Sequence, residues 1–467
     1  MKRISFVTLG CKVNQYDSAA ILNMLPEGGF SEVSFPEEAD IYVINTCTVT
    51  QKADAEARHY ISRAKRINPD GVVIVTGCYA QVSPSELEKA NGVDYIVGNF
   101  DKFSLTEAIQ DAKPQPQPRV IVSDIFKVKE FESPEIKKFP ERTRAFLKIQ
   151  DGCNYRCTFC IIPYARGRSR SLPVIEVLRR MEVLAHSGYK EVVLTGVHLA
   201  SYGRDIGTKL LKLLQDIEKA KIVKRVRLSS LDPADTADEL ISFVASSETI
   251  CPQFHVALQS GDEDVLKRMR RRYTTDKFLH CTNLIREKTP DAAIGTDIMV
   301  GFPGETDKEF ENSFNLAKDS ALTYFHVFPY SKRKGTPAAI MPNQIHPQVI
   351  KDRSSLLRAL GHQKKNEFYR SFIGRKFSVL VERPVLSPSV SLRVNSVEGP
   401  VLSRVEGPAL SRSPERSEGS VERGSRGTTP NYISVRILDG DFKIGDEVQV
   451  EIRDVRGGEA LGLLAPQ

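Results

Sequence analysis

The chain has 467 residues, 40% hydrophobic and 27% charged, as in an ordinary soluble globular protein of two or three domains, and its net charge of +7 permits a polyanionic partner. No stretch approaches the roughly 18 continuous apolar residues of a membrane-spanning helix, and the apolar run near the N-terminus is too short for a signal peptide. We therefore expect a cytoplasmic protein without a membrane partner, whose 8 cysteines serve metal binding or catalysis rather than disulfides.

Residues 1–125 alternate short apolar strands with helical patterns, which predicts a parallel α/β sheet covered on both faces. A cysteine follows each of several strands, at Cys11, Cys47 and Cys78. Because ligands bind outside the carboxyl ends of the strands in open parallel sheets, we expect these thiols to converge at one edge. Two interpretations stay open: small cysteines that pack the strand ends, or a cluster with three protein ligands and one open iron.

Proline and glutamine alternate over residues 114–118, a stiff polar pattern typical of a domain boundary, and we expect a connector over 126–142. Over 143–370 the strand–helix alternation occurs six times, and each strand ends in a polar or glycine-rich segment. This pattern predicts a partial (βα)6 barrel, whose chemistry takes place at the rim formed by the carboxyl ends of its strands.

The first barrel strand leads into the segment C-N-Y-R-C-T-F-C, which contains Cys153, Cys157 and Cys160. Zinc sites usually have four protein ligands, and a [4Fe–4S] cubane is normally held by four thiolates. Three thiolates therefore leave one iron open, where a small molecule can bind and undergo redox chemistry. The alternative is a surface knuckle, or a zinc site completed by a ligand from elsewhere.

Other residues at the predicted rim suit cofactor binding. Thr195 and Gly196 follow the second strand, where a glycine allows close backbone approach. Ser229, Gln259 and Asp297 offer hydroxyl, amide and carboxylate groups after later strands. Each residue taken alone is equally well explained as a strand-end or turn residue.

Arginines also follow the rim strands: Arg166, Arg168, Arg170, Arg270, Arg271 and Arg272. Charge runs usually mark solvated faces. Their repeated placement after rim strands, however, favours a phosphate-bearing substrate, and arginine beside tyrosine suits contact with RNA.

Residues 371–467 contain alternating strand patterns separated by glycine turns, which predicts a small β-barrel of a kind that often binds nucleic acid. An insert over about 385–428 is rich in Ser, Gly, Pro, Arg and Glu and contains no aromatic residue. Such a composition cannot bury enough apolar surface to fold, so we expect this insert to be disordered.

These motifs together resemble those of the radical S-adenosylmethionine methylthiotransferases. The order and spacing of the six motif cysteines support the resemblance, which covers the whole chain except the insert. The segments T-L-G-C-K-V-N-Q, N-T-C-T-V-T and C-I-I-P-Y-A-R-G resemble the branch that acts on N6-threonylcarbamoyladenosine in tRNA. The branches that act on isopentenyladenosine in tRNA and on an aspartate of a ribosomal protein usually read differently there. The insert departs from the pattern of the family's C-terminal RNA-binding barrel, called TRAM.

The resemblance implies two [4Fe–4S] clusters, an auxiliary one on the N-terminal cysteines and one on the barrel cysteines that binds S-adenosylmethionine. It implies that N6-threonylcarbamoyladenosine at position 37 of tRNA, next to the anticodon, is converted to its 2-methylthio derivative. Both clusters must then face one cavity. The implied partners are the tRNA anticodon stem-loop and an electron donor such as flavodoxin or ferredoxin. The alternative that involves no catalysis is an iron–sulfur protein that binds RNA or senses redox state.

Overall fold

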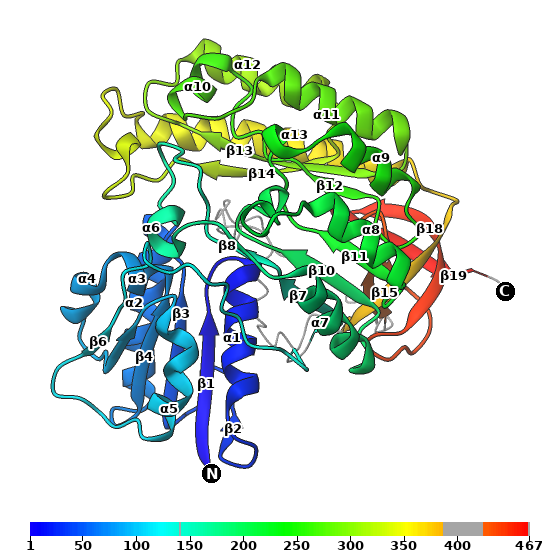
Figure 1. The fold of residues 1–467 in the computed structure, drawn as a ribbon. Helices are drawn as coiled ribbons and strands as arrows, with labels where there is room; N and C mark the ends of the chain where they lie inside the picture. The colour runs from blue at the N-terminus through cyan, green and yellow to red at the C-terminus, as the bar shows by residue number, and fades with distance from the viewer. Residues whose placement is uncertain (140–141, 386–423, 466–467) are drawn as a thin grey trace, which may run out of the picture. The chain divides into compact units, whose positions relative to one another are not determined.

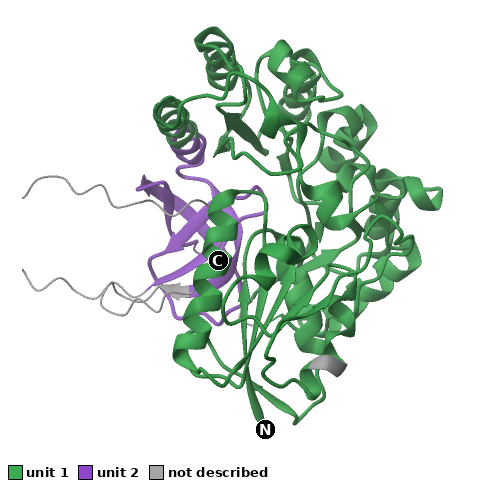
Figure 2. Cartoon of the chain, turned by 90° about the vertical axis from the view of Figure 1, so that its left-hand side faces the viewer, with its two compact units in different colours: residues 1–364 green, residues 365–467 purple. Residues whose placement is uncertain are grey.

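The computed structural model describes residues 1–139, 142–385 and 424–465. The chain divides into two compact units, residues 1–364 and residues 365–467 (Figure 2). Among the described residues, none of the helices is both long enough and apolar enough to cross a membrane.

The first unit begins with a parallel sheet in the order β2-β1-β3-β4-β5-β6 (Figure 1). Its strands are β1 (Lys2–Thr8), β2 (Phe30–Glu32), β3 (Ile41–Thr46), β4 (Val72–Gly77), β5 (Tyr95–Val97) and β6 (Arg119–Ile121). Every residue of β3 and β4 is buried, as expected for central strands that are covered on both faces.

Helices cover the two faces of this sheet. The helical segments are α1 (Lys12–Met24), α2 (Gln51–Ile67), α3 (Cys78–Val82), α4 (Pro84–Glu88), the 3-10 helix η1 (Asp101–Ser104) and α5 (Leu105–Gln110). Apolar residues of α2 and α4 pack with Tyr42, Ile44 and Val75 on one face. Apolar residues of α1 and α5 pack with Val43 and Ile74 on the other. This arrangement confirms the predicted parallel α/β sheet.

The rest of the first unit contains the predicted βα repeats. Parallel strands form the sheets β11-β10-β7 and β12-β13-β14, and an isolated bridge between Val226 and Ile250 links the β11 edge to the segment before β12. The strands are β7 (Arg144–Lys148), β10 (Glu191–Thr195), β11 (Arg225–Leu228), β12 (Gln253–His255), β13 (Ala293–Val300) and β14 (Tyr324–Pro329), with the short pair β8 (Gln150–Asp151) and β9 (Arg170–Ser171). The partial barrel is therefore confirmed, although β12 begins and ends earlier than its sequence pattern indicates.

Helices follow these strands and cover them. They are α6 (Ile162–Arg166), α7 (Val174–His186), α8 (Leu210–Ala220), α9 (Asp238–Ser246), α10 (Glu263–Arg268), α11 (Thr275–Lys288), α12 (Asp307–Asp319) and α13 (Pro347–Arg370), with 3-10 helices η2 (Leu199–Ser201), η3 (Arg204–Ile206), η4 (Pro233–Asp235) and η5 (Pro337–Ile340). Buried residues of α7, α8, α9 and α11 pack with the strands in one large apolar core. Burial of these helix faces supplies the main stabilisation of the barrel.

The second unit contains a closed β-barrel in the order β15-β16-β17-β19-β18. Its strands are β15 (Lys376–Val385), β16 (Gly424–Thr428), β17 (Ser434–Ile437), β18 (Glu447–Arg456) and β19 (Glu459–Leu464). Closure removes the unpaired strand edges of an open sheet. The predicted TRAM-like barrel is confirmed.

The predicted bounds of the insert are wrong at one end. Residues 386–423 lie outside the described residues, but 424–428 form β16, which pairs with β15 and β17. Glycine and serine disfavour strands by intrinsic propensity, so pairing on both sides stabilises this strand.

Candidate active site

The N-terminal cysteines lie at one edge of the parallel sheet, as predicted. Cys11 stands between β1 and α1, Cys47 follows β3, and Cys78 begins α3 directly after β4. Because β1, β3 and β4 are neighbours in the sheet, the three loops meet at the carboxyl ends of their strands. Cys47 and Cys78 are buried, whereas Cys11 is exposed.

Backbone geometry brings Cys11 and Cys47 together. Gly10 has a φ of +88°, a conformation that other residues rarely adopt. A Cβ at this position would lie 2.8 Å from the Cys47 Sγ, so a side chain here would collide with the thiol. The glycine therefore allows the Cys11 loop to approach Cys47 closely.

The electrostatics of this triplet fit a shared cationic group. Burial raises the pKa of the Cys47 thiol well above its ordinary value, and charge on Cys78 or Cys11 raises it further. The metal-free Cys47 thiol therefore keeps its proton, which a bound metal ion would displace. Among the described residues, no three Cys, His, Asp or Glu side chains are grouped to hold a single ion.

The barrel triplet occupies the loop after β8. Gly152, with a φ of +73°, precedes Cys153, and a Cβ there would lie 2.0 Å from the Arg168 carbonyl oxygen. Burial raises the pKa of Cys160 to about 12, and charge on its two partner cysteines adds to that rise. The loop thus holds three cysteines in a tight turn, where ionised thiolates would repel one another unless a cation lay among them.

Arg271, predicted as an RNA contact, lies between α10 and α11 and contacts this loop. Its guanidinium donates a hydrogen bond to the Cys157 Sγ at 3.2 Å and pairs with the Asp232 carboxylate. Burial raises the pKa of Cys157, and the positive charge of Arg271 opposes that rise. We interpret Arg271 as the cation that offsets thiolate charge at the barrel triplet.

Arg166 and Arg170 are both buried, which contradicts their prediction as RNA contacts. Arg166 is 1% exposed, and its guanidinium donates to both carboxylate oxygens of Asp151 at 3.0 and 3.1 Å. Arg170 donates to the Arg166 carbonyl oxygen at 3.0 Å. The other predicted arginines at the rim, Arg168, Arg270 and Arg272, are exposed.

Arg166 also connects the barrel to the N-terminal sheet through a buried charge network. Its guanidinium lies 3.2 Å from the Asp17 carboxylate, which also pairs with Lys148 at 2.6 Å and with Lys102. Burial alone would raise the pKa of Asp17, but Lys102, Lys148 and Arg166 lower it to about 2. The sequence analysis did not identify Asp17, although a carboxylate among apolar residues of α1 was an available signal.

A contact between barrel and sheet lies beside each N-terminal cysteine. Arg166 donates to the Asn14 side chain at 2.5 Å, one turn after Cys11. Arg333 donates to the Thr48 hydroxyl at 2.5 Å, next to Cys47. Asn99 donates both to the Ala165 carbonyl oxygen at 2.7 Å and to the Cys78 Sγ at 3.7 Å. The barrel rim therefore faces the edge of the sheet that carries the thiols, and α6 packs against α3 there (Figure 1).

The predicted cofactor residues occupy successive strand ends. Thr195 ends β10, and a Cβ on Gly196 would lie 2.8 Å from the Gln150 Oε1. Ser229 directly follows β11, and its buried hydroxyl has no hydrogen-bond partner among the described residues. A close backbone approach and an unsatisfied hydroxyl fit a polar ligand at this rim.

The remaining cofactor candidates lie on the segment after β12 and on β13, which an isolated bridge between Gln259 and Ile298 joins. Gln259 has a φ of +64° and donates its backbone N–H to the Asp297 carbonyl oxygen at 2.8 Å. Asp297 lies inside β13 rather than after it, and its carboxylate is 3.1 Å from His255 Nε2. The sequence analysis missed His255, because a histidine in a short buried strand is not distinguished by pattern alone.

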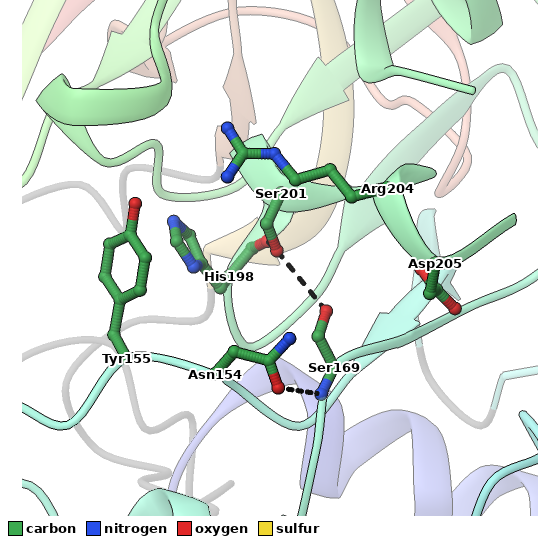
Figure 3. Close-up of a pocket in the computed structure, with 7 residues that line it drawn as sticks. All are labelled: Asn154, Tyr155, Ser169, His198, Ser201, Arg204 and Asp205. Atoms are coloured by element: carbon green, nitrogen blue, oxygen red, sulfur yellow. Dashed lines mark hydrogen bonds between the residues drawn. The ribbon is translucent and has the colours of Figure 1, made fainter. Parts of the chain in front are cut away.

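A small polar cavity of about 150 Å³ lies beside the barrel triplet (Figure 3). It is lined by Asn154, Tyr155, Ser169, His198, Ser201, Arg204 and Asp205. His198 Nδ1 lies 3.8 Å from the Cys153 Sγ, and His198 Nε2 lies 3.0 Å from Asp235. The cavity is smaller than the roughly 300–1,000 Å³ of ordinary ligand pockets, so it is not itself a complete nucleoside site.

Two family models match this chain: residues 3–98 match the uncharacterized protein family UPF0004, and residues 147–317 match the radical SAM superfamily. The threonylcarbamoyladenosine tRNA methylthiotransferase MtaB of Bacillus subtilis (strain 168) is 43% identical over 82% of this chain and 85% of its own length. This chain belongs to the radical S-adenosylmethionine methylthiotransferase family. The methylthiotransferase is thus an enzyme whose family uses S-adenosylmethionine and [4Fe–4S] clusters.

Other relatives agree with this family assignment. The MtaB of Aquifex aeolicus (strain VF5) is 40% identical over 81% of the methylthiotransferase and 92% of its own length. The tRNA-2-methylthio-N(6)-dimethylallyladenosine synthase of Clostridium novyi (strain NT) is 33% identical over 86% of this chain and 90% of its own length. The radical S-adenosylmethionine methyltransferase TsrM of Kitasatospora setae, a solved structure at 15% identity, covers 73% of this chain and 77% of its own with a TM-score of 0.54, and it shares the fold.

Proposed function

We propose that this methylthiotransferase converts N6-threonylcarbamoyladenosine at position 37 of tRNA, next to the anticodon, to its 2-methylthio derivative. The observation that carries the proposal is the contact between the barrel rim and each N-terminal cysteine loop. Sulfur insertion requires a radical source and a sulfur source at one carbon atom, so the two triplets have to open to a shared space. The MtaB relatives, at 43% and 40% identity, favour the threonylcarbamoyl substrate over the dimethylallyl one, whose relative is 33% identical.

In this proposal each triplet holds one [4Fe–4S] cluster. Cys153, Cys157 and Cys160 bind the cluster whose open iron takes S-adenosylmethionine, and Cys11, Cys47 and Cys78 bind the auxiliary one. When bound, these groups supply reductive cleavage of the cofactor and the sulfur for transfer.

The chain's own residues orient the cofactor and keep the site closed. The Ser229 hydroxyl, which has no partner in the described parts of the chain, the Gln259 amide and the Asp297 carboxylate are positioned to bind hydroxyl and amino groups of the cofactor. Thr195 and Gly196 provide backbone groups at the end of β10. Arg271 keeps positive charge against Cys157 while the thiolate is ionised.

RNA contact is assigned to the exposed arginines Arg168, Arg270 and Arg272, which suit phosphate groups. The closed β-barrel of the second unit offers a further RNA-binding element, as small barrels often do. An electron donor such as flavodoxin or ferredoxin is needed to reduce the barrel cluster. A cytoplasmic location belongs to the same proposal, since a tRNA substrate and a low-potential donor are both met there.

The decisive test is mass spectrometry of tRNA nucleosides from cells with and without the gene. We expect the methylthio form of threonylcarbamoyladenosine to disappear and its parent nucleoside to accumulate. Loss of the methylthio form of isopentenyladenosine instead would support the same reaction but show that isopentenyladenosine is the substrate. An unchanged nucleoside profile would contradict the tRNA proposal and favour the ribosomal-protein substrate.

A further inference from the structure

An arginine and two aromatic side chains form an exposed group beside the barrel triplet. Phe126 and Tyr164 are 37% and 40% exposed, and their ring centroids lie 6.0 Å apart in an edge-on arrangement. The Arg156 guanidinium lies 5.4 Å from the Phe126 centroid and 5.8 Å from that of Tyr164. We call these three residues the aromatic platform.

The platform is built from segments that also position both cysteine triplets. Arg156 stands between Cys153 and Cys157 in the loop after β8, and Tyr164 belongs to α6, directly after Cys160. Phe126 lies at the start of the connector. The preceding residue, Ile125, packs closely against the end of α6, because a Cβ on Gly167 would lie only 2.5 Å from the Ile125 carbonyl oxygen.

Helix α6 also packs against α3, which begins with Cys78. Ala165, the neighbour of Tyr164, accepts the Asn99 hydrogen bond at 2.7 Å, and the same amide contacts the Cys78 Sγ. The platform therefore stands next to the barrel triplet, on the helix that also packs against the segment beginning with Cys78, and we expect it to reach a nucleotide adjacent to the modified one.

The chemistry of the platform matches a nucleotide. Within the described parts of the chain, no carboxylate forms an ion pair with Arg156, so its charge is available to a phosphate. Flat aromatic faces stack on bases of any sequence, and an arginine plane adds a cation–π contribution. A purely structural role would bury these rings, whereas more than a third of each remains exposed.

We propose that Phe126, Arg156 and Tyr164 stack a base of the anticodon loop that flanks the modified adenosine. This inference rests on the proposed function and specifies how the RNA is held at that same site. An electron-donor protein would also find an exposed cation here, but exposed aromatic rings beside the barrel triplet favour single-stranded RNA.

The test is binding of an anticodon stem-loop RNA to the full-length, cluster-loaded enzyme, measured by fluorescence anisotropy. Tyr164→Ala and Phe126→Ala should each weaken binding roughly 5- to 150-fold, as expected for the loss of one base–aromatic stack. Tyr164→Phe keeps the ring and should bind like the wild type. Iron content verifies that each variant has folded and assembled its clusters.

A matched control is available on α2. Arg63 stacks over Phe35 with 5.2 Å to the ring centroid, in the same kind of arginine–aromatic pair. It lies twelve residues into α2, about 18 Å along the helix axis from its start beside the Cys47 loop. Arg63→Ala should leave RNA affinity unchanged, whereas Arg156→Ala should reduce it. Equal losses in both variants would contradict the platform.

A second readout reports stacking directly. 2-Aminopurine placed next to the target adenosine should be quenched on binding to the wild type and to Tyr164→Phe, but not to Tyr164→Ala. Stem-loops carrying either threonylcarbamoyladenosine or isopentenyladenosine should show the same loss, so an error in substrate assignment stays distinguishable from failure of the platform. Unquenched probe on the wild type would overturn the proposal. So would unchanged RNA affinity in Tyr164→Ala together with loss of reduction by flavodoxin, which would assign the surface to the electron donor.

Discussion

Cys47 is closely held by its surroundings. It is 5% exposed, Gly10 lies against its side chain, and the neighbouring Thr48 hydroxyl is held by Arg333. Because neighbouring groups fix the loop, removal of the sulfur changes the ligand set more than the local backbone. Cys47 is therefore a suitable residue for testing the auxiliary cluster.

We expect Cys47→Ala to abolish methylthio product while 5′-deoxyadenosine is still released from S-adenosylmethionine. The reason is that the two triplets use separate ligands, so loss of one leaves the other intact. Iron per chain should fall by about half, since each cluster contains four irons. Chromatography of the nucleoside products and an iron assay measure both effects.

Cys251→Ala provides the control, because Cys251 is a buried cysteine outside both triplets. It should retain full iron and full product. Full product in Cys47→Ala would show that this residue is not an auxiliary ligand.

At the scale of elements, α1 couples the sheet to the barrel. The helix begins directly after Cys11, and its Asp17 pairs with Lys102 of η1, Lys148 of β7 and Arg166 of α6. These side chains are at most 1% exposed. Buried charges tolerate little displacement, so the network holds the two cysteine-bearing edges in register.

Asp17→Asn should destabilise the protein by about 3–5 kcal/mol, because three buried cations lose their shared counter-charge. Denaturant unfolding of the cluster-free protein measures the change. Asp216→Asn removes the half-buried partner of the exposed Lys212 on α8 and should cost only about 0–1 kcal/mol. Similar losses in both variants would show that the network contributes no more than a surface pair.

The same network predicts a pH dependence. The pKa of Asp17 is lowered from 3.8 to about 2 in the folded state. Its charge therefore stabilises the fold above about pH 4, and about 2 kcal/mol of this stabilisation is lost as the pH falls toward 2. The stability difference between wild type and Asp17→Asn should shrink over that range in urea unfolding experiments. A difference independent of pH would contradict the assigned pKa.

At the scale of the whole molecule, RNA binding depends more on where positive charge lies than on the net charge. The net charge is only +7, and the buried Arg166 and Arg170 contribute to this total without reaching solvent. Exposed arginines at the barrel rim are available to phosphate groups. RNA affinity should therefore depend on where positive charge is removed.

Replacing Arg168, Arg270 and Arg272 with Gln lowers the net charge from +7 to +4. We expect weaker stem-loop binding and a salt dependence of log K that is shallower by about 2–3, since each lost phosphate contact removes roughly one released counterion. Binding titrations over a range of salt concentrations measure the slope.

The control for this triple variant removes three positive charges from α8 and from the residue that follows it. Replacing Lys212, Lys219 and Lys221, all exposed, with Gln also gives +4 but leaves the rim intact. This variant should retain the wild-type slope. Equal slopes for the two triple variants would show that net charge alone sets the affinity.

The cysteine positions and the strand–helix alternation were sufficient to predict the sheet, the partial barrel and the edge where Cys11, Cys47 and Cys78 meet. This follows from geometry, because parallel strands bring their carboxyl ends to one edge whatever the loop sequences are. Local spacing likewise identified the barrel triplet, since its ligands lie within one short loop.

Only the tertiary structure decided which arginines face solvent. Arg166 and Arg168 are two residues apart in one basic segment, yet Arg166 is buried because Asp17, 149 residues away in sequence, approaches it. In the same way β16 forms from a glycine- and serine-rich segment because β15 and β17 pair with it. Local patterns determine where a strand ends and which side chains follow it, but burial of a charge and pairing of a weak strand depend on partners that folding brings from distant parts of the chain.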